Sequence, residues 1–190
     1  ALYSSPKVGA VSCVANHCSH HQAVAVSYES FEDMQAFAAA YNEPNPARWE
    51  KRTTLVGFCY LFKREVLEEI GFLDTRFSPG NYEDDDYSLR ILQAGYDLLL
   101  CRDTFIHHFG SASFRKDLSA GSDDAEAAKR YNALLDRNGK LFEEKWHVPR
   151  DCWSMSPEEL LPYLERRESE AGTDLAVQKI AVLVRRTHEA

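Results

Sequence analysis

Short apolar runs alternate along this chain with segments of helical periodicity, and this alternation limits the fold more than any other feature. The run VGAVSCV at residues 8–14 is rich in β-branched residues and predicts a strand that ends at Asn16. The continuous apolar run at residues 53–62 predicts a strand that is covered on both faces. Two further short strands are expected over residues 96–101 and 104–108.

Helices are expected between and after these strands. Ser30 caps a helix over residues 31–41, and Gly71 ends a short helix over residues 64–70. Proline-containing loops are expected at residues 42–52 and 72–81. Later helices are expected over residues 83–94, from Asp123 toward Trp146 with an interruption near Asn138 and Gly139, and after a capping box formed by Ser156 and Glu159. The order of the elements predicts an α/β fold.

Composition narrows the class of protein. A chain of 190 residues with 44% apolar and 27% charged residues has the length and make-up of one globular domain. Its net charge of -8 argues against a polyanion such as a nucleic acid as a general partner. No apolar run approaches the roughly 20 residues of a membrane helix, and no signal peptide opens the chain. An odd number of cysteines, five, favours a reduced, cytoplasmic setting.

The acidic run Glu83 to Asp86 opens one of the predicted helices, directly after the turn at Pro79 and Gly80. The helix macrodipole stabilises a first-turn carboxylate by about 0.3 to 1 kcal/mol, which explains one or two acids but not four in a row. Only Asp86 has a local partner, because Arg90 follows it at i, i+4. The other carboxylates suit metal binding or proton abstraction from a substrate hydroxyl, although a solvated helix start accounts for the residue types equally well.

Several segments together carry a resemblance to a known family. They are PKVGAVSCVAN (6–16), VGFCYLFKREVLEEIGFLD (56–74), the stretch from GFLDTRF to FGSASF (71–114) and NGKLFEEKW (138–146). In this order they resemble the acceptor-side region of family 2 glycosyltransferases, which have the glycosyltransferase-A fold. The resemblance implies that residues 1–150 form the C-terminal half of such a domain with a mixed sheet. Residues 151–190 then form a helical tail.

The resemblance also implies an activity. Family 2 enzymes of this kind transfer a sugar, with inversion, from a nucleotide-diphosphate sugar donor to a hydroxyl of a glycan or lipid-linked acceptor. Asp84 then stands at the position of the general base, and Glu83 contacts or supports the acceptor. His108 stands near the metal, and Asp86 with Arg90 matches the structural part of the motif. By residue type alone, Trp49 and Tyr82 are candidate stacking surfaces for an acceptor sugar, although aromatics near turns more often serve in packing. Gly57 could allow the close approach of a sugar ring or of another backbone. Asp85 and Arg90 complete the residues expected to bind substrate.

The sequence departs from the family in one respect. The Asp-x-Asp motif that fixes a Mn²⁺ or Mg²⁺ ion and the donor diphosphate does not precede residue 6, and neither does the nucleotide-binding strand and helix. We therefore expect the chain to be part of a longer polypeptide that supplies most of the metal ligands, and to be inactive or nearly so by itself. The expected setting is cytoplasmic, at the inner face of the membrane with peripheral association, in polysaccharide biosynthesis for the cell envelope.

Three alternatives remain open from the residues. The chain could be a noncatalytic carbohydrate-binding or assembly module derived from a glycosyltransferase. It could be a metal-dependent phosphoesterase built on the Asp and His residues. A structural zinc site is a further possibility, although its residues contain no Cys-x-x-Cys pair: Cys13, His17, Cys18, His20 and His21.

Overall fold

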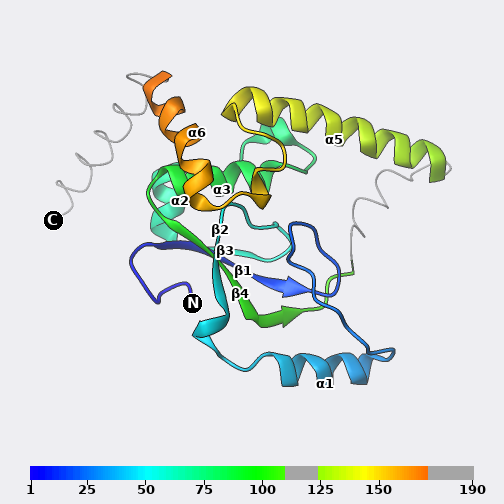
Figure 1. The fold of residues 1–190 in the computed structure, drawn as a ribbon. Coiled ribbons are helices and arrows are strands. Elements are labelled where there is room, and N and C mark those ends of the chain that lie inside the picture. Colours follow the sequence, from blue (N-terminus) through cyan, green and yellow to red (C-terminus); the bar gives the residue numbers. More distant parts are fainter. Residues whose placement is uncertain (110–123, 171–190) are drawn as a thin grey trace.

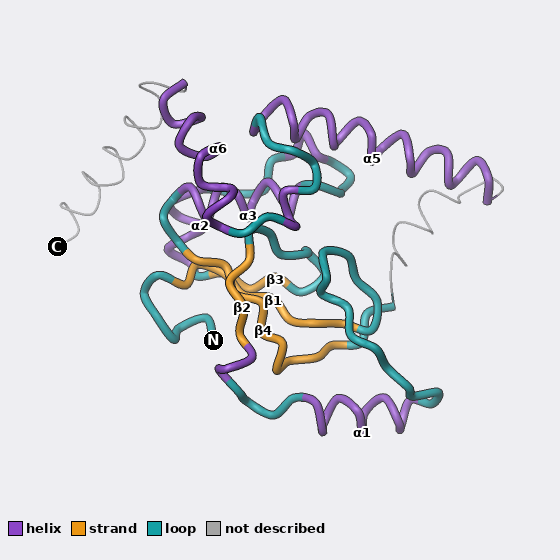
Figure 2. The backbone as a smooth tube through the Cα atoms, in the orientation of Figure 1, coloured by secondary structure: helices purple, strands orange, loops and turns teal. Residues whose placement is uncertain are grey.

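The computed structural model describes residues 1–109 and 124–170, which form a mixed α/β structure. Residues 110–114 of the family-like stretch and residues 171–190 of the predicted tail lie outside the described part. The sheet has four strands in the order β2-β4-β1-β3 (Figures 1 and 2). Strand β1 (Val8–Ala15) runs parallel to β4 (Asp97–Ile106), and the outer strands β2 (Trp49–Arg52) and β3 (Tyr60–Phe62) are antiparallel to their neighbours.

The described residues form five α-helices. Helix α1 (Phe31–Tyr41) begins at Ser30, whose hydroxyl accepts a hydrogen bond from the Asp33 N–H, as predicted. The predicted capping box of Ser156 and Glu159 also forms, at the start of α6. The other helices are α2 (Arg64–Ile70), α3 (Glu83–Gln93), α5 (Asp124–Trp146) and α6 (Pro157–Glu170), with 3-10 turns η1 (Pro46–Arg48), η2 (Thr75–Phe77) and η3 (Cys152–Ser154).

Two hydrophobic clusters fix helix α3 between the sheet and the C-terminal helices. Tyr87 and Ile91 on α3 pack against sheet residues such as Val14 and Leu100. Leu89 on α3 packs into the second cluster, with residues from η2, α5, the segment after α5, η3 and α6: Phe77, Phe142, Trp146, Val148, Cys152, Leu160 and Leu164. The part of the predicted tail that the structure describes therefore shares a core with α3 (Figure 1).

The predicted strand over residues 53–62 is wrong for most of its length. Only Tyr60–Phe62 forms a strand, and its residues are half-buried or exposed rather than covered on both faces. Upstream, the N–H of Leu55 donates to the Ser88 hydroxyl (3.1 Å) and that of Val56 donates to Gln22 Oε1 (2.8 Å). Side chains therefore satisfy backbone groups that a strand would pair in a ladder.

Three other expectations need correction. The predicted loop 42–52 contains β2, which pairs with β4 from Trp49↔Cys101 to Arg52↔Leu98. The two strands predicted at residues 96–108 are one strand, β4, with an irregularity in its pairing to β1 after Cys101. Helix α5 is continuous through Asn138 and Gly139, where an interruption was expected. A Cβ on Gly139 would lie 2.9 Å from the Arg150 guanidinium, so close packing explains this glycine.

Among the described residues, no helix has the length and apolar character needed to cross a membrane.

Candidate functional site

The acidic run lies in the first turn of α3, and the turn before it is held by α5. Asn81 and Tyr82 both adopt the left-handed conformation, with φ of 71° and 70°. The buried Asn138 amide donates to three carbonyls of this turn: Phe77 (2.7 Å), Gly80 (2.8 Å) and Asn81 (3.0 Å). Arg137 donates in turn to Asn138 Oδ1 (2.7 Å). The start of α3 is thereby fixed by a residue that lies more than fifty positions later in the chain.

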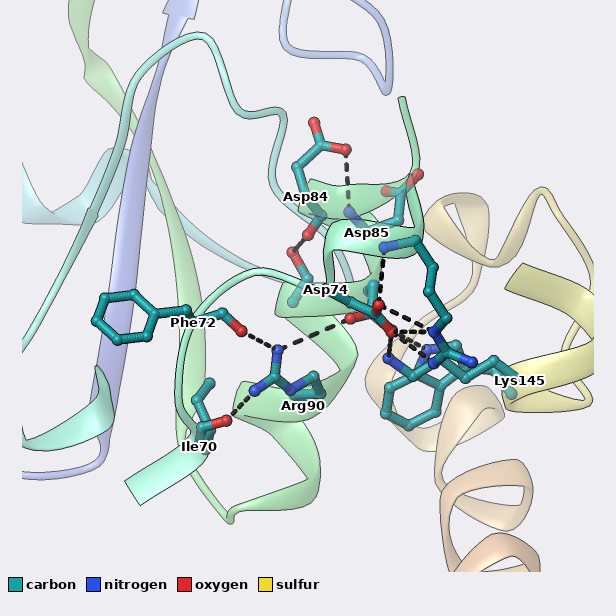
Figure 3. A network of polar contacts seen from close by, with 11 residues as sticks. Ile70, Phe72, Asp74, Asp84, Asp85, Arg90 and Lys145 are labelled. Carbon is teal, nitrogen blue, oxygen red and sulfur yellow. Dashed lines mark hydrogen bonds and ion pairs between the residues drawn. The ribbon is translucent and has the colours of Figure 1, made fainter. Parts of the chain in front are cut away.

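Asp84 is oriented by two backbone N–H groups. Its Oδ2 accepts from Gly57 N (2.7 Å), and its Oδ1 accepts from Asp85 N (3.0 Å; Figure 3). Each carboxylate oxygen has two lone pairs, so each can accept one more hydrogen bond. Gly57 is exposed and Asp84 is half-buried, so this site is not fully enclosed. Burial nevertheless raises the pKa of Asp84 above its ordinary value.

The carboxylates on either side of Asp84 are also removed from water. Oε2 of Glu83 is buried and has no hydrogen-bond partner among the described residues. Burial, followed by repulsion from Asp84, raises the pKa of Glu83 and raises the pKa of Asp85 well above the usual range. Three neighbouring carboxyls therefore share one poorly solvated site, a condition that strongly perturbs proton affinities in active sites.

Asp85 faces a group of rings that the sequence did not reveal. Its Oδ1 lies 3.5 Å from Nδ1 of His20, whose ring stacks on Trp153 at 5.0 Å. Burial lowers the pKa of His20 to about 4, so this imidazole is neutral at neutral pH. Thr54 lies 3.3 Å from the same Nδ1 and also hydrogen-bonds to the Asp85 carboxyl.

Asp86 is structural. Its Oδ1 accepts from Lys145 Nζ (2.6 Å) and from the indole N–H of Trp146 (2.7 Å), both on α5. The predicted pair with Arg90 is present but long, at 3.9 Å. Arg90 donates mainly to the carbonyls of Ile70 and Phe72. It therefore joins α3 to the end of α2 and the loop that follows it.

Three of the predicted site residues lie around the loop at Gly57. A Cβ on Gly57 would meet Asp84 Cβ at 3.2 Å, so the close approach of loop and carboxylate requires glycine here. The next residue, Phe58, stacks on His108 at 5.1 Å. Nδ1 of His108 lies 3.0 Å from the His17 carbonyl, which leaves Nε2 as its free ring nitrogen. His107 instead contacts the Tyr28 hydroxyl at 2.5 Å, and both histidines follow the end of β4.

The two predicted aromatic contacts have structural partners. Trp49 lies at the start of β2, packs on the sheet cluster formed by Val8, Val11, Leu99 and Cys101, and donates its indole N–H to Asp103 (2.9 Å). Tyr82 precedes α3 and packs against Phe142 at 5.5 Å. Tyr82 adjoins Glu83 in the chain, whereas the partners of Trp49 belong to the sheet.

Two polar residues that sequence reasoning missed hold the Gly57 loop in place. Ser88, one turn after Asp84, accepts from Leu55 N and donates to the Asp84 carbonyl (2.8 Å). Gln22 is fully buried, accepts from Val56 N and donates to Ser12 Oγ (3.1 Å). For Ser88, its position four residues after Asp84 on the predicted helix was the only sequence signal for a role beside the site.

No set of three or more His, Cys, Asp or Glu side chains in residues 1–109 and 124–170 is arranged to hold a metal ion. The five residues considered for zinc include Cys13, which is buried in β1, and His20, which faces Asp85. His108 offers one free ring nitrogen, which is a single ligand.

The geometry defines what the site can do. It presents one carboxylate, held by two N–H groups at an exposed loop, with its pKa raised and with a free lone pair on each oxygen. Such a group can accept a hydrogen bond from a hydroxyl and then take its proton. Comparisons of the chain with family models, with curated proteins and with solved structures give no match.

Proposed function

We propose that this chain is the acceptor-side half of an inverting glycosyltransferase with a glycosyltransferase-A-like fold, in which Asp84 is the general base. The acceptor hydroxyl of a glycan or lipid-linked substrate gives its proton to Asp84 while its oxygen attacks the anomeric carbon of a nucleotide-diphosphate sugar. The bond from that carbon to the diphosphate breaks, and the nucleoside diphosphate leaves with the electron pair. Because the attack comes from the face opposite the leaving group, the anomeric configuration inverts.

The observation that carries this proposal is the pairing of Asp84 with the Gly57 loop. The Gly57 N–H holds one oxygen at 2.7 Å and the Asp85 N–H holds the other at 3.0 Å, so the carboxylate cannot rotate away from an incoming hydroxyl. Fixed geometry of this kind is a large part of the rate gain in enzymes.

Electrostatics support the same role. A base is most effective when its pKa approaches the working pH, and burial raises the pKa of Asp84 in that direction. Burial, followed by repulsion from Asp84, raises the pKa values of Glu83 and Asp85 as well, so several charges are disfavoured together at this site. General-base assistance of this type contributes roughly 10²- to 10⁴-fold to a rate.

A divalent ion such as Mn²⁺ or Mg²⁺ would stabilise the leaving diphosphate, and His108 is the one described residue proposed to reach it. The carbonyl of His17 fixes the tautomer that leaves Nε2 free, and Phe58 fixes the plane of the ring. The remaining ligands and the donor site are proposed to belong to a preceding part of the polypeptide.

The test uses the product of the complete reading frame. It is incubated with Mn²⁺ and a panel of uridine- and thymidine-diphosphate sugars, and transfer to cell-envelope acceptors is measured. Asp84→Asn is expected to lose about 10²-fold or more in turnover and to retain donor affinity by calorimetry. Asp136→Asn, an exposed aspartate on α5, is the matched control and should transfer at the wild-type rate. Absence of transfer with every donor would favour the noncatalytic carbohydrate-binding or assembly module instead.

A further inference from the structure

Two cysteines are paired across the sheet, and a third lies directly before the neighbouring strand β3. Cys13 on β1 pairs directly with Cys101 on β4. On the other side of β1, the antiparallel register with β3 runs through Val11↔Leu61 and Ser12↔Tyr60. Cys59 directly precedes Tyr60, so this register brings it beside Cys13 at the point where β3 begins.

This cross-strand position suits a disulfide. Ser12 and Tyr60, the neighbours of these two cysteines, are directly opposite, a position in which Cα atoms are about 4.5 to 5.5 Å apart. A disulfide joins Cα atoms that are about 4.4 to 6.8 Å apart, so the bond needs little movement of the backbone. Cys59 lies just outside the strand, and its thiol is close enough to that of Cys13 for each to shift the pKa of the other.

The two thiols already interact. A hydrogen bond from the Cys13 thiol lowers the pKa of Cys59 to about 7. The same bond, together with burial, raises the pKa of Cys13. Cys59 is half-buried, whereas Cys13 is 3% exposed, so a reagent from solvent reaches Cys59 first. Burial raises the pKa of Cys101 to about 11, which makes that thiol the less reactive neighbour of Cys13.

We propose that Cys59 and Cys13 are a redox-active pair. They form a reversible disulfide with each other when a low-molecular-weight disulfide such as oxidised glutathione acts as the oxidant. The Cys59 thiolate attacks one sulfur of the reagent, and a mixed disulfide forms as the first reagent thiolate leaves. Cys13 then gives its proton to that thiolate and attacks the Cys59 sulfur, which displaces the second reagent thiolate. Two protein thiols are oxidised and one reagent disulfide is reduced to two thiols.

The position of Cys59 gives the bond a structural consequence. Cys59 lies two residues after Gly57, and only Phe58 separates them. A Cys13–Cys59 bond extends the contact between β1 and β3 by one residue and anchors the loop that holds Asp84. The disulfide itself does not depend on the proposed glycosyl transfer, and its test needs no activity.

The test treats the folded chain with oxidised glutathione at neutral pH and follows products by intact mass and peptide mapping. The wild type is expected to lose two hydrogen atoms and to yield one linked peptide pair containing Cys13 and Cys59. Cys13→Ala should stop at a glutathione adduct on Cys59, because the resolving thiol is absent. Cys59→Ala should lower the rate of thiol loss at least about tenfold.

Cys101→Ala is the matched control, because Cys101 also lies opposite Cys13 but on the parallel neighbour. This variant should form the Cys13–Cys59 bond at the wild-type rate, and circular dichroism before treatment shows that each variant is folded. A linkage through Cys101 or Cys18, or a wild-type adduct at Cys59 that never resolves, would overturn the proposal. An inert Cys59 in the folded wild type, with modification only after unfolding, would overturn it as well.

Discussion

The backbone N–H of Gly57 donates a 2.7 Å hydrogen bond to Oδ2 of Asp84, and this bond joins the loop before β3 to the first turn of α3. A Cβ at residue 57 would lie 3.2 Å from Asp84 Cβ and 3.3 Å from its Oδ2. Loop and carboxylate are therefore in contact because this position has no side chain. The contact leads to a specific prediction about activity.

Gly57→Ala should push the Asp84 carboxylate a few tenths of an ångström from its place and weaken its hydrogen bond. We expect a loss of about 10- to 100-fold in turnover, because small displacements of catalytic groups are costly. Stability should change little, since Gly57 is exposed. Steady-state kinetics and urea unfolding of the complete polypeptide measure both effects, and wild-type turnover in the variant would contradict the assigned contact.

Gly9→Ala provides the contrasting case. A Cβ there would meet Cβ of Tyr96, which lies between α3 and β4, at 2.6 Å, and Cγ2 of Ile91 on α3 at 2.9 Å. This variant should unfold about 1 to 3 kcal/mol more easily, because overpacking forces neighbours out of place. An equilibrium unfolding midpoint equal to that of the wild type would show that the sheet and α3 are less closely packed than described.

The Asn138 amide should be essential to the turn before α3. Asn138→Asp keeps the shape of the side chain but removes its two N–H donors and sets a carboxylate against the carbonyls of residues 77, 80 and 81. We expect it to reduce the free energy of unfolding by about 2 to 4 kcal/mol. Asn132→Asp, an exposed position on the same helix, is the control and should unfold like the wild type. Equal effects of the two substitutions would show that Asn138 does not hold the turn.

The raised pKa values also predict how stability depends on pH. A carboxyl whose folded pKa lies above its unfolded value binds its proton more tightly when folded. The free energy of unfolding therefore falls as the pH rises from about 4, the ordinary aspartate value, through the raised pKa of Asp85. Asp85→Asn removes this titration and should be more stable than the wild type at neutral pH, by about 1 kcal/mol or more.

Urea unfolding at a series of pH values checks this prediction. The wild-type and Asp85→Asn curves should approach each other near about pH 4 and separate as the pH rises. Parallel curves over the whole range, or a variant that is less stable at neutral pH, would show that Asp85 is stabilised as an anion by its surroundings. A gain in stability would agree with the common observation that residues needed for function lower the stability of the folded protein.

Local signals in the sequence were sufficient for several elements. Ser30 and the pair of Ser156 and Glu159 mark helix starts because a cap needs only residues within one turn. Gly71 ends α2 for the same reason, with its N–H donating to the Leu67 carbonyl. The α/β character followed from the order of such elements, and the mixed four-stranded sheet agrees with it.

Long-range contacts explain what the sequence could not predict. The apolar run at residues 53–62 predicts a strand. In the structure the side chains of Ser88 and Gln22 instead accept hydrogen bonds from the backbone N–H groups of Leu55 and Val56. Asp86 was assigned to Arg90, its local partner, whereas its closest cation is Lys145 on α5 at 2.6 Å. Pairings across this distance in the chain leave no periodicity that reveals them. The contact between Asp84 and Gly57 is also between residues far apart in the chain, so the sequence could not predict it.

The most direct test of the account is the turnover of Asp84→Asn measured beside its donor affinity, in the product of the complete reading frame. Loss of the base should reduce sugar transfer by about 10²-fold or more, while the dissociation constant for the nucleotide sugar stays at the wild-type value. The Asp136→Asn control should retain full transfer. Turnover of Asp84→Asn equal to that of the wild type would contradict the central claim that Asp84 takes the proton of the acceptor hydroxyl.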